Sequence, residues 1–533
     1  YEELGYEFLN KLNGVFALAL SDGRTLFLAR DRLGVKPLYY TWVNNRFYFA
    51  STVQALLICP GVDRVVDSGA LDDYMTFQYI PAPKTLFEGI YKLSPGIWMK
   101  INQKGAWVNR YWELPPVARR RRMSPDVVIT RTATFLEEAV RRRAADHEPV
   151  GVLLSGGLDS SAVAALLRRN HPGPMKTFHV KFAGENGEEV FALEVAAALG
   201  VEHYELEAGP RELSALPRVI STLAEPFADA AAWATYLLCR FAKEHVIILL
   251  TGDGGDEVFG GYPRYLLSRL AGGCQRVPAV LRDLTVGVLD KVENSRVLNG
   301  KSRYLSKVLN SPTTPWERNV AWLSIFSEDE RSALYTADFK REVGDGRGAE
   351  LYERYYRQGV GHSVMRRLTT ADVKTWLADD LLSKIHCAST AAGVEVRLPL
   401  LDHFLVDYVA SLGDRYRFGW GVSKALLKKA VRHLLPASVL RRRKRAFVVP
   451  VEKWLRDHER EWICDTVTSP QALGRGYFRP EAVRALLKEF LDKGVGGGKI
   501  WNLFCLELWQ QEFVDNYLPA HFRLDEKRCG ILS

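Results

Sequence analysis

Residues Ser155 to Ser161 combine glycines, hydroxyls and a carboxylate at a spacing that could hold phosphate groups. The segment reads Ser-Gly-Gly-Leu-Asp-Ser-Ser. Its glycines allow a tight turn with no Cβ in the way. The hydroxyls, with the free N–H groups at the start of a following helix, would form an anion site. Asp159 adds a carboxylate, which beside phosphates is typical of Mg²⁺ binding. No Gly-Lys-Ser/Thr follows, so the loop is not a Walker A loop.

A second loop, from Thr251 to Tyr262, carries three carboxylates within five residues: Asp253, Asp256 and Glu257. Carboxylates this crowded repel one another unless a cation lies nearby. By itself the motif is also compatible with a polar turn that caps a helix, because Gly and Asp favour turns. Together with the first loop, it predicts a site where phosphates and a divalent cation meet.

Apolar runs precede both loops and would position them. Residues 150–154 come before the first loop and residues 246–250 before the second, and small residues at 162–167 favour a helix after the first. Strands that alternate with helices over residues 126–270 indicate a doubly wound parallel sheet. Ligand sites of such sheets lie at the carboxyl ends of the strands. We therefore expect both loops to face one crevice.

The rest of the chain shows two other patterns. Residues 16–20, 25–29 and 46–50 are short apolar runs separated by turn residues, which indicates a β-rich N-terminal region. From about residue 270 onward the pattern is mostly helical. We predict an α+β domain at 1–115, a linker at 116–125, an α/β domain with a helical C-terminal part at 126–520, and a tail at 521–533.

Composition excludes several classes of protein. A chain of 533 residues is too long for one core, and 47% hydrophobic with 25% charged residues is ordinary for a globular protein. No apolar run reaches the ~20 residues of a membrane span. The chain opens Tyr-Glu-Glu-Leu, without a signal peptide. Its seven cysteines are scattered and never spaced Cys-x-x-Cys, which disfavours a zinc site or disulfides. We expect a cytoplasmic protein with no membrane partner.

The net charge of +9 raises the question of nucleic-acid binding. It is concentrated in two basic runs, at residues 119–122 and 441–445. Neither run contains the interleaved aromatic residues that stack on bases. Charge runs are more often solvated surfaces, so we expect no nucleic-acid partner.

The whole chain resembles the glutamine-hydrolysing asparagine synthases. The first loop is similar to the pyrophosphate loop of ATP pyrophosphatases, which cleave ATP between its α- and β-phosphates. Family motifs follow in the family's order over nearly the whole chain, at residues 29–40, 80–90, 92–96, 110–112, 225–229 and 393–402 besides the two loops.

The resemblance implies a fold and a reaction. It implies an N-terminal-nucleophile amidotransferase β-sandwich joined to an ATP-pyrophosphatase synthetase domain, with ammonia passing between them. The cofactors would be ATP and Mg²⁺, and the substrates aspartate and either glutamine or ammonia. The aspartate β-carboxylate would attack the α-phosphate of ATP, giving β-aspartyl-AMP and pyrophosphate. Ammonia would then displace AMP and form asparagine.

The resemblance also implies roles for individual residues. Asp253 and Lys424 would be catalytic, and Asp159 and Asp256 would bind Mg²⁺. Four residues would line the nucleotide site: Leu154, Val180, Thr251 and Gly252. The loop residues that would hold the pyrophosphate are Ser155, Gly156, Gly157, Ser160 and Ser161.

The chain departs from the family pattern in three places. His386-Cys387 stand where the family often has an acidic or amide residue followed by Lys or Arg. Arg443 and Ala446 replace the proline and glycine of an Arg-Pro-Lys-x-Gly-Phe motif. The nucleophilic N-terminal cysteine has no counterpart at Tyr1, so residues 1–115 match the second half of the glutaminase domain. We therefore expect this chain, read as N-terminally truncated, to depend on ammonia.

Other readings remain open at the level of sequence. A sibling amide-forming enzyme, of the β-lactam synthetase or lasso-peptide cyclase type, would share the adenylation site and take another carboxylate. A tRNA-thiolating pyrophosphatase commonly needs paired cysteines, and a non-catalytic scaffold would show an eroded ATP loop. Neither feature is found here. Monomer and homodimer are both open.

Overall fold

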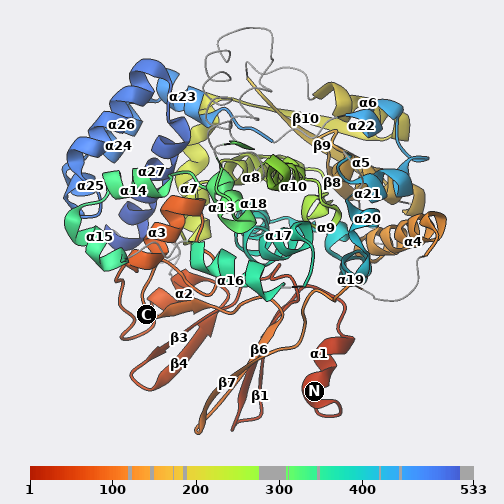
Figure 1. The fold of residues 1–533 in the computed structure, drawn as a ribbon, viewed down its shortest axis with the longest axis horizontal. Helices are drawn as coiled ribbons and strands as arrows, with labels where there is room; N and C mark the ends of the chain where they lie inside the picture. Colours follow the sequence, from red (N-terminus) through yellow and green to blue (C-terminus); the bar gives the residue numbers. More distant parts are fainter. Residues whose placement is uncertain are drawn as a thin grey trace, which may run out of the picture.

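The computed structural model describes residues 1–117, 123–144, 149–171, 173–183, 189–274, 308–309, 311–344, 349–359, 361–418, 422–442 and 447–515 (Figure 1). The predicted tail at 521–533 lies outside these residues, as do Arg443, Ala446 and part of the predicted linker at 116–125. Both domain boundaries of the linker therefore stay predictions.

The N-terminal region forms two antiparallel sheets, at the bottom of Figure 1. More exposed and less exposed residues alternate along several of these strands, as in sheets with one solvated face. Three short helices accompany them: α1 (Phe8–Lys11), α2 (Val53–Leu57) and α3 (Ser68–Phe77). The larger sheet has the order β1 (Ala17–Ser21), β2 (Leu26–Arg30), β6 (Ile97–Asn102), β7 (Gly105–Arg110), and the smaller β4 (Arg46–Ala50), β3 (Tyr39–Val43), β5 (Ile90–Lys92).

A five-stranded sheet, parallel throughout, follows in the chain. Its order is β10 (Glu202–Ala208), β9 (Met175–Phe182), β8 (Val150–Leu153), β11 (Ile248–Leu250), β12 (Glu395–Arg397). The chain runs outward from β8 through β9 to β10, then returns to place β11 on the other side of β8. The strand order therefore reverses between β8 and β11, and such switch points are where ligands bind.

Helices cover this sheet and extend the domain. The first of them, α4 (Pro125–Arg143), starts with Ser124, whose Oγ accepts from the Val127 N–H, and with a proline in the first turn. The others near the sheet are α5 (Leu158–Asn170), α6 (Glu189–Leu199), α7 (Leu216–Leu223), α8 (Ala231–Ala242) and α9 (Gly255–Phe259).

The C-terminal half is helical, as its pattern predicts, except for β12. This strand has three residues, and it is defined by parallel pairing with β11 rather than by apolar periodicity. A π-helical segment, η4 (Val373–Leu381), joins α17 to α18. The described helices are α10 (Pro263–Cys274), α13 (Pro315–Leu323), α14 (Glu328–Leu334), α15 (Ala337–Val343), α16 (Glu350–Gln358), α17 (Val364–Asp372), α18 (Leu382–Ala392), α19 (His403–Ser411), α20 (Asp414–Arg417), α21 (Ala425–Val431), α22 (Ala437–Arg441), α23 (Val451–Asp457), α24 (Arg460–Val467), α25 (Pro470–Gly474), α26 (Pro480–Lys493) and α27 (Gly497–Gln510).

The N-terminal sheets are joined firmly to the helices. Helix α3 is almost wholly buried, and its Tyr74 hydroxyl donates to the Asn502 carbonyl of α27 at 2.8 Å. Asp72 of α3 pairs with Arg331 of α14 at 2.8 Å. The Trp112 indole donates to Asp407 of α19 at 3.0 Å. Residues of both regions thus share one apolar core.

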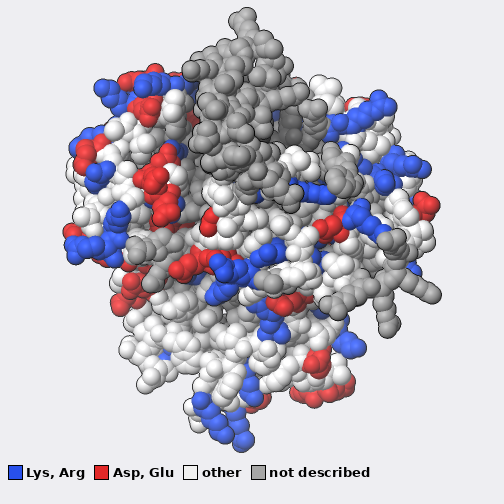
Figure 2. All heavy atoms as spheres, in the orientation of Figure 1, with Lys and Arg blue, Asp and Glu red and all other residues white. Residues whose placement is uncertain are grey.

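The face in Figure 2 carries interspersed basic and acidic side chains, with a mostly uncharged lower part. No described helix is both long enough and apolar enough to cross a bilayer.

Candidate active site

A cavity of about 640 Å³ opens at the carboxyl ends of the central strands. Both loops singled out in the sequence contribute to its wall. Of the thirteen residues predicted for the site, those that line the cavity are Leu154, Ser155, Gly157, Asp159, Ser160, Val180, Thr251, Gly252, Asp253, Asp256 and Lys424. The remaining two, Gly156 and Ser161, are not among the residues that line it.

The first loop is held by its own hydroxyls. The Ser155 Oγ lies 3.1 Å from the Ser160 Oγ and accepts from the Gly157 N–H at 3.3 Å. Gly156 has a positive φ of 66°, and a Cβ there would lie 2.6 Å from the backbone nitrogen of Ala192 in α6. Gly156 thus lets the loop pack on α6. Ser161 is fully buried in α5.

The second loop approaches the first one closely. A Cβ on Gly252 would lie 2.5 Å from the backbone nitrogen of Ser160, so only glycine allows this approach. The neighbouring Thr251 hydroxyl donates to the carboxylate of Asp253. This hydrogen bond turns Asp253 toward the start of its own loop, at the cavity wall.

Lys424 joins the acidic residues of the two loops. Its Nζ contacts the carboxylate of Asp159 and lies 2.7 Å from Asp256 Oδ1. The side chain is buried, which lowers its pKa, but the two carboxylates outweigh burial and raise the pKa above the ordinary lysine value. The ammonium therefore stays charged at neutral pH. Lys424 is the residue immediately before α21. Its φ of 54° lies in the left-handed region that few non-glycine residues adopt.

The two carboxylates also fit a magnesium site. They come from different loops, and a cation, the ammonium of Lys424, already lies between them. Mg²⁺ in nucleotide sites is commonly held by one or two carboxylates together with substrate phosphates. This agrees with the described residues, among which no group of three or more His, Cys, Asp or Glu side chains could hold a metal by itself.

Basic side chains gather beside the first loop. Lys428, one turn after Lys424, and Arg442 both line the cavity. The Arg442 Nη1 donates to the Ser155 carbonyl at 3.3 Å, and its guanidinium stacks on the Phe191 ring at 4.3 Å. This end of the cavity combines lysine and arginine charges with the serine hydroxyls, which is a suitable environment for phosphates.

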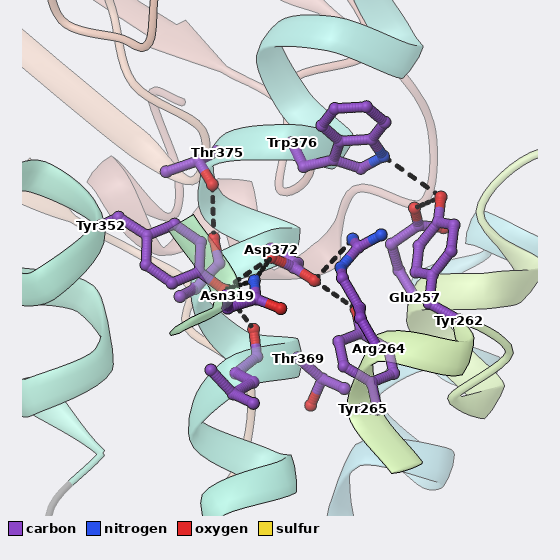
Figure 3. Close-up of polar contacts among 12 residues, drawn as sticks. Glu257, Tyr262, Arg264, Tyr265, Asn319, Tyr352, Thr369, Asp372, Thr375 and Trp376 are labelled. Carbon is purple, nitrogen blue, oxygen red and sulfur yellow. Dashed lines mark hydrogen bonds and ion pairs between the residues drawn. The ribbon is translucent and has the colours of Figure 1, made fainter. Parts of the chain in front are cut away.

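The opposite wall is a buried hydrogen-bonded network (Figure 3). The Tyr262 hydroxyl donates to Glu257 Oε1 at 2.6 Å and accepts from the Trp376 indole at 3.1 Å. Burial and the neighbouring Asp256 raise the pKa of Glu257 to about 7. Arg264 stacks on the Tyr262 ring at 3.8 Å and pairs with Asp372 at 2.8 Å. The wall is thereby tied to α17 and η4.

Sequence reasoning missed several residues of this cavity, among them Asp229, Lys384 and Trp376. One signal was present for Lys384: a lysine inside the apolar run 381–385 needs a buried partner. The departures His386 and Cys387 line a second, smaller cavity, together with Arg30, Tyr39 and Glu225 of the interdomain boundary. Burial lowers the pKa of His386 to about 4, so its ring is neutral at physiological pH.

The second region is an adenine-nucleotide α-hydrolase domain: its sheet is parallel, and a glycine-rich phosphate loop and an acidic loop lie at the switch point. The antiparallel sheets that precede it form an amidotransferase domain. Residues 131–511 match the asparagine synthase family model, and residues 1–112 match the glutamine amidotransferase domain model. The chain belongs to the asparagine synthase family.

Individual relatives agree with this assignment. The chain is 30% identical to asparagine synthetase [glutamine-hydrolyzing] 1 of Bacillus subtilis, over 97% of this chain and 81% of the relative. It is 31% identical to a putative asparagine synthetase [glutamine-hydrolyzing] of Mycobacterium bovis, over 97% and 79%. A more distant relative, amidase chry2 of Gibberella zeae, is 25% identical over 93% of this chain and 78% of its own length.

Proposed function

We propose that the protein converts aspartate, ATP and ammonia into asparagine, AMP and pyrophosphate. The observation that carries the proposal is the meeting of Asp159, Asp256 and Lys424 beside the serine-rich loop, inside one cavity. Such a site places a cation-binding centre next to a phosphate-binding loop, which is the arrangement that adenylation by ATP requires. Family membership supports the choice of aspartate.

The first step would be attack on the α-phosphorus of ATP. A β-carboxylate oxygen of aspartate forms a bond to this phosphorus, and the bond to the β-phosphate oxygen breaks, releasing pyrophosphate. The loop at Ser155 and the cations Lys428 and Arg442 hold the leaving pyrophosphate. Lys424 stabilises the negative charge that grows on the α-phosphate. Mg²⁺ held by Asp159 and Asp256 would neutralise the phosphate oxygens and fix their orientation.

The second step would be amide formation. Ammonia attacks the acyl carbon of β-aspartyl-AMP, loses a proton, and AMP leaves with the acyl–oxygen electron pair. Asp253 lies at the cavity wall, where it can orient the amino acid or accept this proton. In the relatives named glutamine-hydrolysing, glutamine is the nitrogen source, and the amidotransferase region suggests the same source for the full system.

Product analysis tests the proposed reaction directly. The purified chain is incubated with ATP, Mg²⁺, aspartate and ammonium, and nucleotides are separated by chromatography. AMP and pyrophosphate are expected in equal amounts with asparagine, because the loop holds a pyrophosphate leaving group. ADP as the main nucleotide product would contradict the assignment. Replacing aspartate by other carboxylic acids in the same assay distinguishes an aspartate-specific enzyme from a sibling amide-forming enzyme that uses another carboxylate.

The 533-residue polypeptide is expected to use free ammonium and not glutamine. A cysteine must be a thiolate to attack glutamine. Burial raises the pKa of Cys239 and Cys387 to about 12, and that of Cys505 also rises. These thiols are therefore protonated. Asparagine formation should increase with pH through the alkaline range, since NH₃ rather than ammonium is the nucleophile.

The measurement is glutamate release from glutamine beside asparagine formation from ammonium chloride. Cys59, the cysteine of the amidotransferase region, is half-buried at the end of α2 and serves as the control through Cys59→Ala. This variant should leave ammonium-dependent synthesis unchanged. Glutamate release by the unmodified polypeptide would refute the expectation, and its loss in Cys59→Ala would identify the nucleophile.

A further inference from the structure

A buried ion pair in the cavity wall joins two residues that belong to neither of the two loops. Lys384 of α18 and Asp229, just before α8, both line the cavity, and the Lys384 Nζ lies 3.1 Å from Asp229 Oδ2. The side chains are only 8% and 20% exposed. Burial lowers the pKa of Lys384, but Asp229, Asp380 and Asp253 more than compensate and raise it. The Lys384 ammonium is therefore charged, and Asp253 is near it.

This pair keeps hydrogen-bonding capacity for a ligand. Among the described residues Asp229 is the hydrogen-bond acceptor for the Lys384 ammonium, which has three N–H donors. Asp229 accepts one further bond, from the Ala231 N–H at 2.9 Å. Its two oxygens can accept about four hydrogen bonds.

In the other ion pair of this wall, between Arg264 and Asp372, protein side chains already fill the hydrogen-bonding capacity of the carboxylate. Asp372 accepts from Arg264, Tyr265, Tyr352 and Asn319 (Figure 3). Its Arg264 partner is also covered by the Tyr262 ring. A carboxylate with four donors has little capacity left for a ligand. The Arg264–Asp372 pair supports the wall, whereas the Asp229–Lys384 pair can exchange its partners.

The cavity wall contains two groups of charged side chains. At one end, beside the serine-rich loop, Lys428 and Arg442 accompany Lys424, whose charge is already paired with Asp159 and Asp256, and these cations suit phosphates. At the other end, Lys384 stands with Asp229 and Asp253, so both signs of charge are present. A ligand that itself carries one ammonium and one carboxylate matches this end.

We propose that Asp229 and Lys384 are specificity-determining residues that bind the amino-acid substrate: Asp229 its α-ammonium group and Lys384 its α-carboxylate. The inference rests on the proposed function. The two groups would separate on binding and each would take an oppositely charged group of the substrate. The β-carboxylate is then left pointing toward Lys424 and the α-phosphate.

Two simple acids separate the two contacts. Succinate is aspartate without the α-ammonium, and β-alanine is aspartate without the α-carboxylate. Aspartate-dependent exchange of labelled pyrophosphate into ATP is measured for the wild type, and each acid is tested as a substrate or as a competitive inhibitor of that exchange. The apparent affinities of all three acids are compared with that of ATP.

Asp229→Asn should weaken the binding of aspartate and of β-alanine by about 10- to 100-fold, the scale of one charged hydrogen bond. The affinity for succinate should not change. Lys384→Met should weaken the binding of aspartate and of succinate to the same degree, and it should leave the affinity for β-alanine unchanged. ATP affinity should stay within about twofold of the wild type for both variants, because the phosphate-binding end is unchanged.

The matched control is Lys374→Met, on η4. Lys374 pairs with Glu113 at 3.1 Å and is absent from the residues that line the cavity. It should change none of the affinities. An equal loss of affinity for all three acids would show a structural role and overturn the inference. So would a loss of affinity that is accompanied by weaker ATP binding and a lower melting temperature. No aspartate-dependent exchange by the wild type would instead overturn the proposed function, and the inference with it.

Discussion

Replacing Asp159 by alanine is expected to lower the rate of aspartate-dependent pyrophosphate exchange by about three orders of magnitude, the scale of losing several kcal/mol of metal-mediated charge stabilisation. Asp159 and Asp256 converge from two loops onto one cation position. Without Asp159, that position keeps a single carboxylate, so Mg²⁺ and the α-phosphate lose their fixed orientation. Exchange is measured at saturating ATP over a range of Mg²⁺ concentrations.

The Mg²⁺ titration distinguishes the metal role from a structural one. Higher Mg²⁺ should restore part of the activity of Asp159→Ala, because weakened metal affinity is overcome by mass action. Asp126→Ala is the matched control: Asp126 also lies in the first turn of a helix, but it is exposed on α4. It should behave as the wild type. Full exchange activity in Asp159→Ala at low Mg²⁺ would exclude Asp159 as a metal ligand.

Lys424→Ala is expected to reduce kcat for pyrophosphate exchange by roughly 10²–10³, the effect of removing one preorganised electrostatic stabiliser. Asp159 and Asp256 hold the charged ammonium inside the cavity, on the side of the two loops. KM for ATP should change much less than kcat, because the serine-rich loop and Arg442 still hold the phosphates. Steady-state kinetics and ATP titration give the two values.

Lys429→Ala provides the comparison for this variant. Lys429 lies on the same helix, α21, and its side chain is exposed. Removing it takes the same charge from the chain without touching the cavity, so activity should be unchanged. If both lysine variants lost activity equally, a general effect on α21 would explain the result and the proposed role of Lys424 would be wrong. A rise in KM without a fall in kcat would make Lys424 a binding residue.

The sequence by itself determined the two loops and the sheet that carries them. A glycine-rich segment between an apolar run and a small-residue run allows few backbone paths, and short apolar runs alternating with helical patterns lead to a parallel sheet. The apolar runs at residues 16–20, 25–29 and 46–50 form strands β1, β2 and β4, with bounds that differ by at most one residue, whereas β3 was not predicted. The family motifs supplied the positions of Asp253 and Lys424, which local pattern alone does not distinguish from other acids and lysines.

Only the tertiary structure decided which distant residues share the cavity. Asp159, Asp256 and Lys424 are separated by up to 265 residues, and their contact depends on how α21 packs against α4 and α9. Strand β12 exists because β11 offers it hydrogen bonds, which no local periodicity reveals. Lys384 and Asp229, 155 residues apart, meet because α18 packs against α8. Long-range packing sets these distances, since side chains separated along the chain have no preferred separation until the core between them is formed.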